Sequence, residues 1–318
     1  MMTREEILKA EEIYVSDFGL MIPMVLKNVG YIFDKNSLTW FVQKRYYSWK
    51  VYNKRISPEE ALDLMDSWER AAAEKNELLG KAISFAAEKH AGQVRKGTHI
   101  PYIVHPMEVL QILYSMRADT YVMIAGVLHD TVEDTDTSLE EIRELFGDYV
   151  AELVASNSED KSKSWDERKQ HTIDALPGAQ LDVQMLILAD KLSNLRSIAY
   201  DYKNIKDKLW ERFNAPKEKQ AWYYGGIQDG LYDIQFAEEC ESAYWEFVGL
   251  YKDVFVKYYL DEANDTLYQQ CDDGSAFYLK KGDSQWYDAR EVAIPECCEV
   301  LSRRDAEFLE DVWNMRVR

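Results

Sequence analysis

The chain has 318 residues, of which 47% are hydrophobic, 13% aromatic and 30% charged. This composition is typical of a globular protein and excludes collagen-like, coiled-coil and disordered chains, and the length suits about two domains. The net charge is −19, from 38 basic and 57 acidic side chains, which argues against duplex nucleic acid as a partner because Lys and Arg supply most affinity for its phosphates.

The four cysteines form no C-x-x-C pair, a usage typical of reduced thiols in the cytoplasm. We expect neither a secretion signal nor a membrane partner, because the first residues carry both charges and no apolar stretch approaches the roughly 20 residues of a bilayer span.

The N-terminal part of the chain predicts a hairpin followed by a helix. Residues 31–51 are rich in aromatic and β-branched side chains, and the turn-forming run Asp34-Lys35-Asn36-Ser37 interrupts them. Apolar spacing then predicts a helix at residues 56–68. We assign residues 1–73 to this N-terminal hairpin-plus-helix unit.

The middle of the chain, residues 74–237, predicts an all-helical domain. Apolar side chains recur there at the three- and four-residue spacing of amphipathic helices. Ser138 and Glu141 form the pattern of a capping box at the start of one of these helices. The expected helices cover residues 76–91, 106–116, 121–132, 138–156, 165–176 and 181–200.

The acidic C-terminal part, residues 238–318, resembles the N-terminal unit. Strand-like aromatic segments with a turn at Asp273-Gly274 precede the helix LSRRDAEFLEDVW, which aligns without gaps with ISPEEALDLMDSW near the N-terminus. The coinciding pairs are Ser57/Ser302, Ala61/Ala306, Asp66/Asp311 and Trp68/Trp313. We interpret this as a duplication; the alternative is a chance similarity between two amphipathic helices. The predicted fold is therefore mostly α, with a helical core flanked by small α+β units at both ends, and these units offer a surface for a protein partner.

Polar residues inside the apolar segment VMIAGVLHDTVED are the first candidates for chemistry. One helical turn places His129 over Glu133, and Asp130 over Asp134, along adjoining rows of one helix surface. Three carboxylates this close raise one another's pKa, and burying them without a partner is costly. A bound metal ion is the simplest explanation of such a cluster.

Two further residues complete a candidate set of metal ligands. His105 lies in PYIVHP just before a predicted helix, and Asp190 is the only carboxylate in the apolar strip at residues 185–192. With His129 and Asp130 they offer two imidazoles and two carboxylates, a mixture of N and O ligands suited to manganese, iron or zinc. Each residue by itself is more often an ordinary core or surface side chain, so the prediction depends on their combination.

The segment at residues 86–198 resembles the hydrolase half of the RelA/SpoT-homologue proteins, which are HD-domain phosphohydrolases. The matching elements, in chain order, are AAEKHAGQVRKG, PYIVHP, GVLHDTVEDT, FGDYVAELV, EDK and LADKLSNLR. The likeness is strongest to the small alarmone hydrolases of this family. Those enzymes remove the 3′-diphosphate from guanosine tetra- and pentaphosphate with manganese, so the resemblance implies an HD-domain core with this activity.

The resemblance also implies a role for each matching residue. The metal ligands that it implies are His105, His129, Asp130 and Asp190. Glu133 and Asp134 match the carboxylates that orient or deprotonate the attacking water, a modest task beside an ion that lowers the pKa of bound water from 15.7 toward about 7. The substrate-binding residues that it implies are Arg95, Lys96, Tyr102 and Asn194, around the base, the phosphates and the ribose.

The match is looser farther along the chain. Lys161 corresponds to a lysine near the diphosphate, and Lys219 and Tyr223 correspond to an Arg and a Tyr that contact phosphate. A lysine in place of arginine gives a point charge without bidentate geometry, which weakens this part of the assignment. Ordinary solvated side chains are the alternative at all three positions.

The sequence contains no P-loop, no G-x-G-x-x-G string and nothing similar to the synthetase domain of this family, so we expect hydrolysis alone. The predicted protein is a cytoplasmic, metal-dependent phosphohydrolase similar to guanosine-3′,5′-bis(diphosphate) 3′-pyrophosphohydrolases. Mn²⁺ is the expected cofactor, with Fe, Zn or Mg as alternatives, and a guanosine nucleotide is the expected small-molecule partner. Two other interpretations stay open: a different nucleotide substrate, such as an adenosine alarmone or the 2′-phosphate of NADPH, or a nucleotide sensor without turnover.

Overall fold

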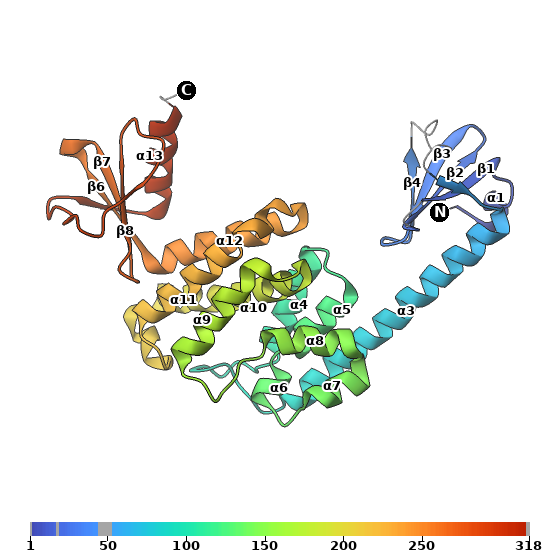
Figure 1. Cartoon of the computed structure of the whole chain (residues 1–318), viewed down its shortest axis with the longest axis horizontal. Coiled ribbons are helices and arrows are strands. Elements are labelled where there is room, and N and C mark those ends of the chain that lie inside the picture. Colours follow the sequence, from blue (N-terminus) through green and yellow to red (C-terminus); the bar gives the residue numbers. More distant parts are fainter. Residues whose placement is uncertain (1, 17–18, 44–52, 316–318) are drawn as a thin grey trace. The chain divides into compact units, whose positions relative to one another are not determined.

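The computed structural model describes all residues of the chain except 1, 17–18, 44–52 and 316–318 (Figure 1). The chain divides into two compact units, Met1–Leu78 and Leu79–Arg318. The finer division into three parts, with boundaries after residues 73 and 237, stays a prediction. Among the described residues, no helix is both long enough and apolar enough to cross a membrane.

An antiparallel sheet with the strand order β4-β3-β2-β1-β5 forms most of the N-terminal unit. Its elements are α1 (Arg4–Ile7), β1 (Glu12–Ser16), β2 (Met21–Leu26), β3 (Val29–Asp34), β4 (Thr39–Gln43) and β5 (Asn53–Arg55). Strands β3 and β4 form the predicted hairpin, and the Asp34 side chain accepts hydrogen bonds from the N–H groups of Asn36 and Ser37 in its turn. The remainder of the predicted hairpin, residues 44–51, lies outside the described residues.

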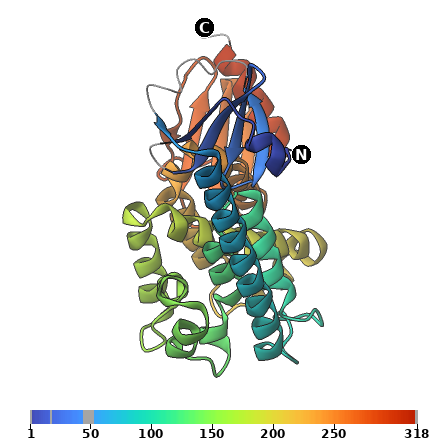
Figure 2. The same ribbon diagram turned by 90° about the vertical axis from the view of Figure 1, so that its right-hand side faces the viewer.

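Helix α3 (Pro58–Lys89) follows this sheet and unites two predicted helices. The sequence predicts separate helices at residues 56–68 and 76–91, whereas α3 is one continuous helix, drawn in blue to teal in Figure 2. Near its start, Ala61 and Trp68 are buried in the core of the N-terminal unit. The Trp68 ring stacks on Phe33 of β3, with ring centroids 6.0 Å apart.

A second antiparallel sheet, near the C-terminus, has the strand order β10-β6-β7-β8-β9. Its elements are β6 (Val256–Asp261), β7 (Thr266–Cys271), β8 (Ala276–Lys280), β9 (Tyr287–Asp288), β10 (Glu299–Leu301) and the helix α13 (Arg303–Met315). Taken strand by strand, this order is the same as that of the first sheet, and in both cases a helix follows the fifth strand. Ala306 and Trp313 are buried in the core below this sheet, as their counterparts Ala61 and Trp68 are in the first. The shared topology supports the predicted duplication.

The helical core lies between these two sheets in the sequence. Its α-helices are α4 (Val104–Ser115), α5 (Thr120–Leu128), α6 (Thr131–Asp134), α7 (Leu139–Phe146), α8 (Asp148–Asn157), α9 (Trp165–Ala175), α10 (Leu181–Ile205), α11 (Lys217–Gly230) and α12 (Glu238–Phe255). Short 3₁₀ helices connect them or follow them: η1 (Leu176–Gly178), η2 (Lys206–Arg212), η3 (Tyr232–Phe236) and η4 (Glu262–Asn264). Helix α10 is central, because α4, α5, α8 and α12 all pack against it (Figure 1).

The helix predicted at residues 138–156 is two helices in the structure. Gly147 has a φ of 91°, which ends α7 and allows α8 to start in a new direction. The Ser138 side chain accepts the N–H of Glu141, as the predicted capping pattern requires.

The helix predicted at residues 121–132 is also interrupted. Helix α5 ends at Leu128 and α6 begins at Thr131, so the residues between them, His129 and Asp130, form a junction. The Thr131 hydroxyl donates to the carbonyl oxygen of Leu128 over 2.7 Å and takes up an acceptor at the end of α5. This junction separates the polar residues that the sequence places on one helix.

Candidate active site

Four predicted metal ligands converge in the interior of the helical core. His105 lies on the first turn of α4, Asp190 lies in the middle of α10, and His129 and Asp130 occupy the junction of α5 and α6. Nε2 of His129 is 3.0 Å from Oδ2 of Asp130, and Nε2 of His105 is 3.2 Å from Oδ1 of Asp190. The crossed distances are 3.5 Å from His105 Nε2 to Asp130 Oδ2 and 3.7 Å from His129 Nε2 to Asp190 Oδ1. The structure therefore brings together all four side chains.

Hydrogen bonds on the far side of each imidazole fix its orientation. Nδ1 of His129 donates to the carbonyl oxygen of Gly126 over 2.7 Å. Nδ1 of His105 lies 2.8 Å from the hydroxyl of Ser193, which donates its own proton to Glu108 and therefore accepts from the histidine. Partners of this kind are the usual means of turning the second ring nitrogen toward a metal. Both histidines thus present Nε2 to the carboxylates.

The charges of the cluster balance one another in a buried setting. Burial would raise the pKa of Asp190, but Lys191, whose Nζ is 2.7 Å from Oδ2, and the two histidines outweigh it and hold this pKa well below its usual value. Burial would lower the pKa of His129, but the neighbouring Asp130 and Asp190 outweigh it and raise this pKa. Burial dominates at His105 and lowers its pKa. Without a metal, one imidazolium and one ammonium therefore face two carboxylates.

The cluster fits a divalent cation. Nε2 of His129 is buried and makes no hydrogen bond within the described part of the chain, although it faces Asp130. The ligand atoms of His105, His129 and Asp130 all lie within 4.8 Å of one another, as a shared ion requires. A divalent ion would satisfy the free nitrogen and the carboxylates together, and two imidazoles with two carboxylates are ligands that Zn, Mn and Fe accept.

Ser193 offers a test of this arrangement. We expect Ser193→Ala to lower metal affinity about 10- to 100-fold, because His105 then loses the partner that orients its ring. Metal titration monitored by calorimetry measures the change, and Ser84→Ala on the exposed side of α3 is the matched control. An unchanged affinity in Ser193→Ala would mean that His105 is not a ligand.

Glu133 and Asp134 lie near the cluster, but not on the helix that the sequence predicts. The prediction of one continuous helix is wrong, because α6 starts only after the junction. The predicted turn between Asp130 and Asp134 is present, since the N–H of Asp134 donates to the carbonyl oxygen of Asp130 over 2.9 Å. Oε1 of Glu133 accepts the N–H of Glu159 over 2.6 Å, and burial raises the pKa of the Glu133 carboxyl. This hydrogen bond ties α6 to the segment that follows α8.

Tyr102 connects Asp134 to the ligand cluster. Its hydroxyl is 2.6 Å from Oδ2 of Asp130 and 3.2 Å from Oδ2 of Asp134. Burial and the adjacent Asp130 raise the pKa of Tyr102, so the hydroxyl keeps its proton and donates it to these carboxylates. Asp134 is thereby held beside the cluster.

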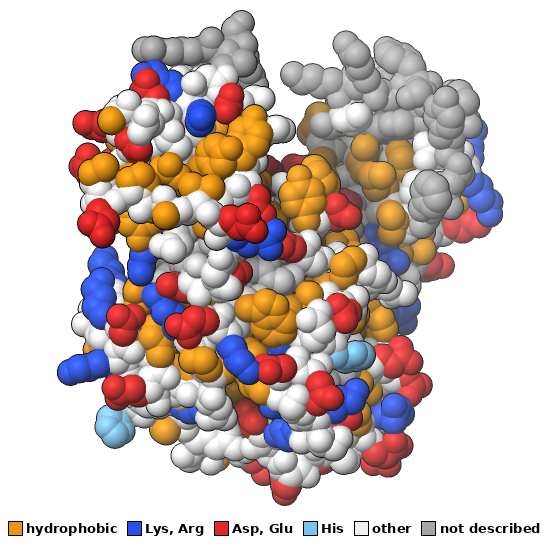
Figure 3. All heavy atoms as spheres, turned by 60° about the vertical axis from the view of Figure 1, so that its left-hand side comes forward, with side chains coloured by type: hydrophobic (Ala, Val, Ile, Leu, Met, Phe, Trp, Pro, Cys, Tyr) orange, Lys and Arg blue, Asp and Glu red, His pale blue; other side chains and the backbone are white. Residues whose placement is uncertain are grey.

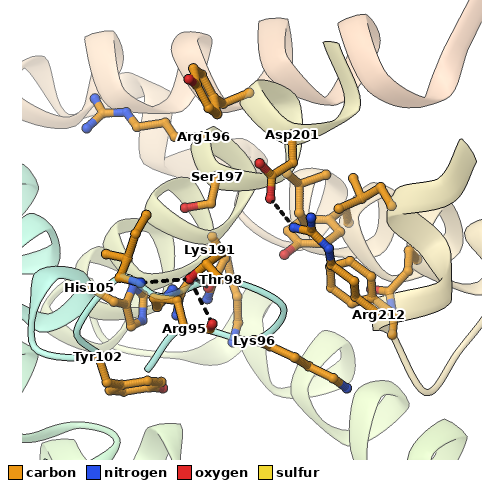
Figure 4. A pocket seen from close by; sticks show the side chains of 18 of the residues that line it. Arg95, Lys96, Thr98, Tyr102, His105, Lys191, Arg196, Ser197, Asp201 and Arg212 are labelled. Carbon is orange, nitrogen blue, oxygen red and sulfur yellow. Dashed lines mark hydrogen bonds and ion pairs between the residues drawn. The ribbon is translucent and has the colours of Figure 1, made fainter. Parts of the chain in front are cut away.

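A pocket of about 690 Å³ opens beside the cluster (Figure 4). The loop at residues 92–101 and the helices α9, α10, η2 and α11 supply most of its lining. The basic residues that line it are Arg95, Lys96, Lys169, Lys191, Arg196 and Arg212. The acidic residues that line it are Glu108, Asp134 and Asp201. On the outer face shown in Figure 3, by contrast, basic and acidic side chains are interspersed. An anionic ligand suits the excess of basic residues in the pocket.

Most of the predicted substrate-binding residues line this pocket. The ones that do are Arg95, Lys96, Tyr102, Asn194 and Tyr223. A terminal nitrogen of Arg95 donates to Oδ1 of Asn194 over 2.7 Å, and Asn194 in turn donates to Oδ1 of Asp190 over 2.6 Å. Arg95 also lies over the Tyr102 ring, 5.6 Å from its centroid. These contacts join the loop to the cluster of candidate metal ligands.

Two predicted substrate-binding residues do not line the pocket. Nζ of Lys219 is 2.6 Å from Oδ2 of Asp166 and forms an ion pair with it. Lys161 instead lies near the cluster, where Nζ donates to the backbone oxygen of Glu133 and is 3.9 Å from Oδ1 of Asp134. The sequence of this chain matches the family less well at Lys219, and in the structure the Lys219 side chain binds Asp166 and does not line the pocket.

Four basic pocket residues escaped the sequence analysis: Lys169, Lys191, Arg196 and Arg212. Nζ of Lys169 lies 4.6 Å above the ring of Tyr223 and 2.5 Å from Oε1 of Glu159. The position of Lys191 immediately after Asp190 was a usable signal, because a lysine beside a buried carboxylate compensates its charge. Arg212 lies on η2, beyond the helices that the sequence predicts, and only the tertiary structure brings it to the pocket.

The fold and the site together define a class of protein. A family model described as an HD domain matches residues 82–213, a range that contains all four members of the cluster. The chain is therefore an HD-domain protein.

Named enzymes that are similar to this chain identify its family within the HD-domain proteins. The guanosine-3′,5′-bis(diphosphate) 3′-pyrophosphohydrolase of Danio rerio is 41% identical over 124 residues, which are 38% of this chain and 69% of the relative. The enzyme of the same name from Homo sapiens is 42% identical over 129 residues, which are 40% of this chain and 72% of the relative. The chain belongs to the family of HD-domain guanosine-bis(diphosphate) 3′-pyrophosphohydrolases.

A solved structure is also similar to this chain. It is described as a metazoan orthologue of SpoT that hydrolyses ppGpp, and it is 28% identical with a TM-score of 0.46. The match covers 55% of this chain and 94% of that one.

Proposed function

We propose that this chain is a metal-dependent hydrolase that removes the 3′-diphosphate from guanosine tetra- and pentaphosphate. The observation that carries the proposal is the cluster of two imidazoles and two carboxylates at the edge of a pocket rich in basic residues. Relatives that are 41% and 42% identical to this chain carry this activity in their names. Water adds to the phosphorus that is bonded to the 3′ oxygen and the 3′ O–P bond breaks. The 3′ oxygen leaves and takes up a proton as the 3′ hydroxyl of GDP or GTP, and the attacked group is released as diphosphate.

We assign His105, His129, Asp130 and Asp190 as the residues that hold the metal ion. When bound, the ion polarises a phosphoryl oxygen and lowers the pKa of water at the site. Mn²⁺ is our choice of ion, because the set of N and O ligands lacks a thiolate, and Fe, Zn and Mg are the alternatives to be tested. Metal content after purification, and activity with each ion added to the metal-free protein, distinguish them.

We assign Glu133 and Asp134 as the proton acceptors for the attacking water. The hydrogen bond that Tyr102 donates keeps Asp134 beside the cluster, and burial raises the pKa of Glu133, which makes it a stronger proton acceptor. The substrate-binding roles go to residues that line the pocket, with the cationic side chains on the phosphates: Arg95, Lys96, Tyr102, Asn194 and Tyr223. Lys161 would reach the diphosphate from the side of α6, whereas Lys219 would first have to leave Asp166.

The test is diphosphate release from guanosine tetraphosphate by the purified protein with added Mn²⁺. We expect turnover in the wild type and none above background in Asp130→Ala. A panel that includes the corresponding adenosine nucleotide and NADPH identifies the substrate if another nucleotide is turned over. Tight binding without turnover of any of them would overturn the proposal in favour of a sensor.

The cellular location belongs to the same proposal. All four cysteines are free thiols, two of them buried, as expected of a protein in the reducing cytoplasm.

A further inference from the structure

The end of the pocket that is remote from His105 holds an ion pair between α10 and η2. Nη1 of Arg212 is 2.7 Å from Oδ2 of Asp201, and the two residues lie across the pocket from His105 in Figure 4. The exposed fractions of the two side chains are 27% and 28%, so the pair is neither fully buried nor free in solvent. Both residues line the pocket and are therefore accessible to a ligand in it.

The neighbouring loop fixes the place of Arg212. Gly97 has a φ of 73°, and a Cβ atom there would lie 2.5 Å from Cδ of Arg212. The glycine therefore allows the arginine side chain to pack directly on the loop backbone. Lys96, next to it, donates from Nζ to Oδ1 of Asn214 over 3.3 Å and makes a second bridge between the loop and the segment after η2. The guanidinium group is thus held on two sides, by Asp201 and by the loop.

Apolar side chains surround this end of the pocket. Ile198 of α10 and Leu209 of η2 both line it, with only 4% and 2% of their surface exposed. Phe213 lines it as well, and its ring packs against Trp210 with centroids 5.7 Å apart. An apolar slot with a few polar groups at one end is the usual form of a site for a flat ring.

We propose that Asp201 and Arg212 select guanine over adenine at this end of the pocket. Guanine carries two acceptors, N7 and O6, beside two donors, the N1–H and N2 amino groups. The guanidinium donates to N7 and O6, as Arg does when it reads guanine in DNA, and the carboxylate accepts from N1–H and the amino group. Adenine keeps the acceptor N7, but it carries an amino donor in place of O6, the acceptor N1 in place of N1–H, and no 2-amino group. One guanidinium donor and the carboxylate would therefore each face a group of the wrong kind. This inference deepens the proposed function and depends on it for the identity of the substrate.

A base suits this pair better than a phosphate does. A phosphate group on Arg212 would lie beside the carboxylate of Asp201, and the two negative charges would repel each other. The basic residues Arg95, Lys169 and Lys191 line the same pocket and remain available to the phosphates. Within the ion pair, Arg212 keeps further N–H donors and Asp201 keeps a second carboxylate oxygen, and a ligand can bind to both.

The first experiment needs no substitution. The wild type is assayed with guanosine, inosine and adenosine nucleotides that carry the same 5′- and 3′-diphosphates. We expect kcat/KM to be about 10- to 100-fold higher for guanosine than for adenosine, with inosine between them because it lacks only the 2-amino group. Equal values for guanosine and adenosine would overturn the inference.

The second experiment changes Asp201 alone. In Asp201→Asn we expect the guanosine-to-adenosine ratio of kcat/KM to fall at least tenfold, mostly through a higher KM for guanosine, because the amide no longer offers two acceptor sites. Asp207→Asn, on the exposed side of η2, is the matched control and should keep the ratio of the wild type. The ratio comes from one preparation, so a partly unfolded variant does not change it. A ratio that stays at the wild-type value in Asp201→Asn overturns the inference.

A third measurement separates this inference from the proposed function. If the wild type hydrolyses none of the three nucleotides, the proposed function fails, and equilibrium binding of GDP and ADP still tests the base. We expect GDP to bind the wild type at least tenfold more tightly than ADP, and Asp201→Asn to lose this preference. Equal affinities in the wild type would overturn the inference independently of turnover.

Discussion

Asp190→Asn is expected to abolish metal retention and to lower diphosphate release by at least about 10³-fold. Asp190 lies on the central helix α10, is only 3% exposed and faces both histidines through one carboxylate oxygen. The amide has the same shape but no charge, so it should remove one ligand from the ion without opening a cavity. Loss of the ion costs several kcal/mol of transition-state stabilisation, and about 4 kcal/mol corresponds to the stated factor.

Thermal unfolding provides a measurement that does not depend on turnover. A divalent ion at about 100 times its Kd stabilises the folded wild type by about 2.7 kcal/mol. For a unit of this size, that energy raises Tm by roughly 5–10 °C. Asp190→Asn should show no such rise, and Asp182→Asn, in the first turn of the same helix and outside the cluster, should show the rise of the wild type. A full metal-induced rise in Asp190→Asn would remove Asp190 from the ligand set.

The part of the metal centre that the sequence reveals is the part that is local. His129 and Asp130 are adjacent, and their position among buried apolar residues marks them without a structure. His105 and Asp190 are far from them along the chain. Their local context made them candidates, and the family resemblance implied the same set of four ligands. The junction between α5 and α6 was not predictable, because no Gly or Pro marks it. It depends on capping by the Thr131 hydroxyl, and threonine is also common inside helices.

The residues that line the pocket were harder to predict from the sequence than the candidate metal ligands. Arg95 and Lys96 could be predicted because they lie in a short motif next to the cluster. Arg212 could not, since its role depends on how closely η2 approaches the backbone at Gly97. Lys219 shows the reverse error: it has the right position in the sequence, but it pairs with Asp166 and does not line the pocket. Long charged side chains choose among nearby partners, and a sequence does not say which partner is nearest.

The duplicated end units were predictable from a few positions because those positions carry packing constraints. An alanine allows the helix to approach the sheet, and a tryptophan two turns later fills the core, so both recur as Ala61/Ala306 and Trp68/Trp313. The identity of strand order in the two sheets could not be predicted, because it depends on pairings between distant strands. One copy of this topology precedes the helical core in the sequence and one follows it. Among the described residues, those that line the pocket lie between 95 and 224, which indicates a role for the end units apart from the chemistry.

Trp68→Ala tests this separation of roles. The Trp68 side chain is 6% exposed and stacks on Phe33, so its removal should destabilise the N-terminal unit by about 3–5 kcal/mol, enough to unfold a small sheet. We expect limited proteolysis to cleave residues 1–57 rapidly in this variant, while diphosphate release stays within about twofold of the wild type. Trp245→Ala is the matched control, because Trp245 on α12 is half exposed and should contribute much less. If Trp68→Ala instead abolished turnover while metal binding remained intact, the N-terminal unit would have a part in catalysis that the composition of the pocket does not suggest.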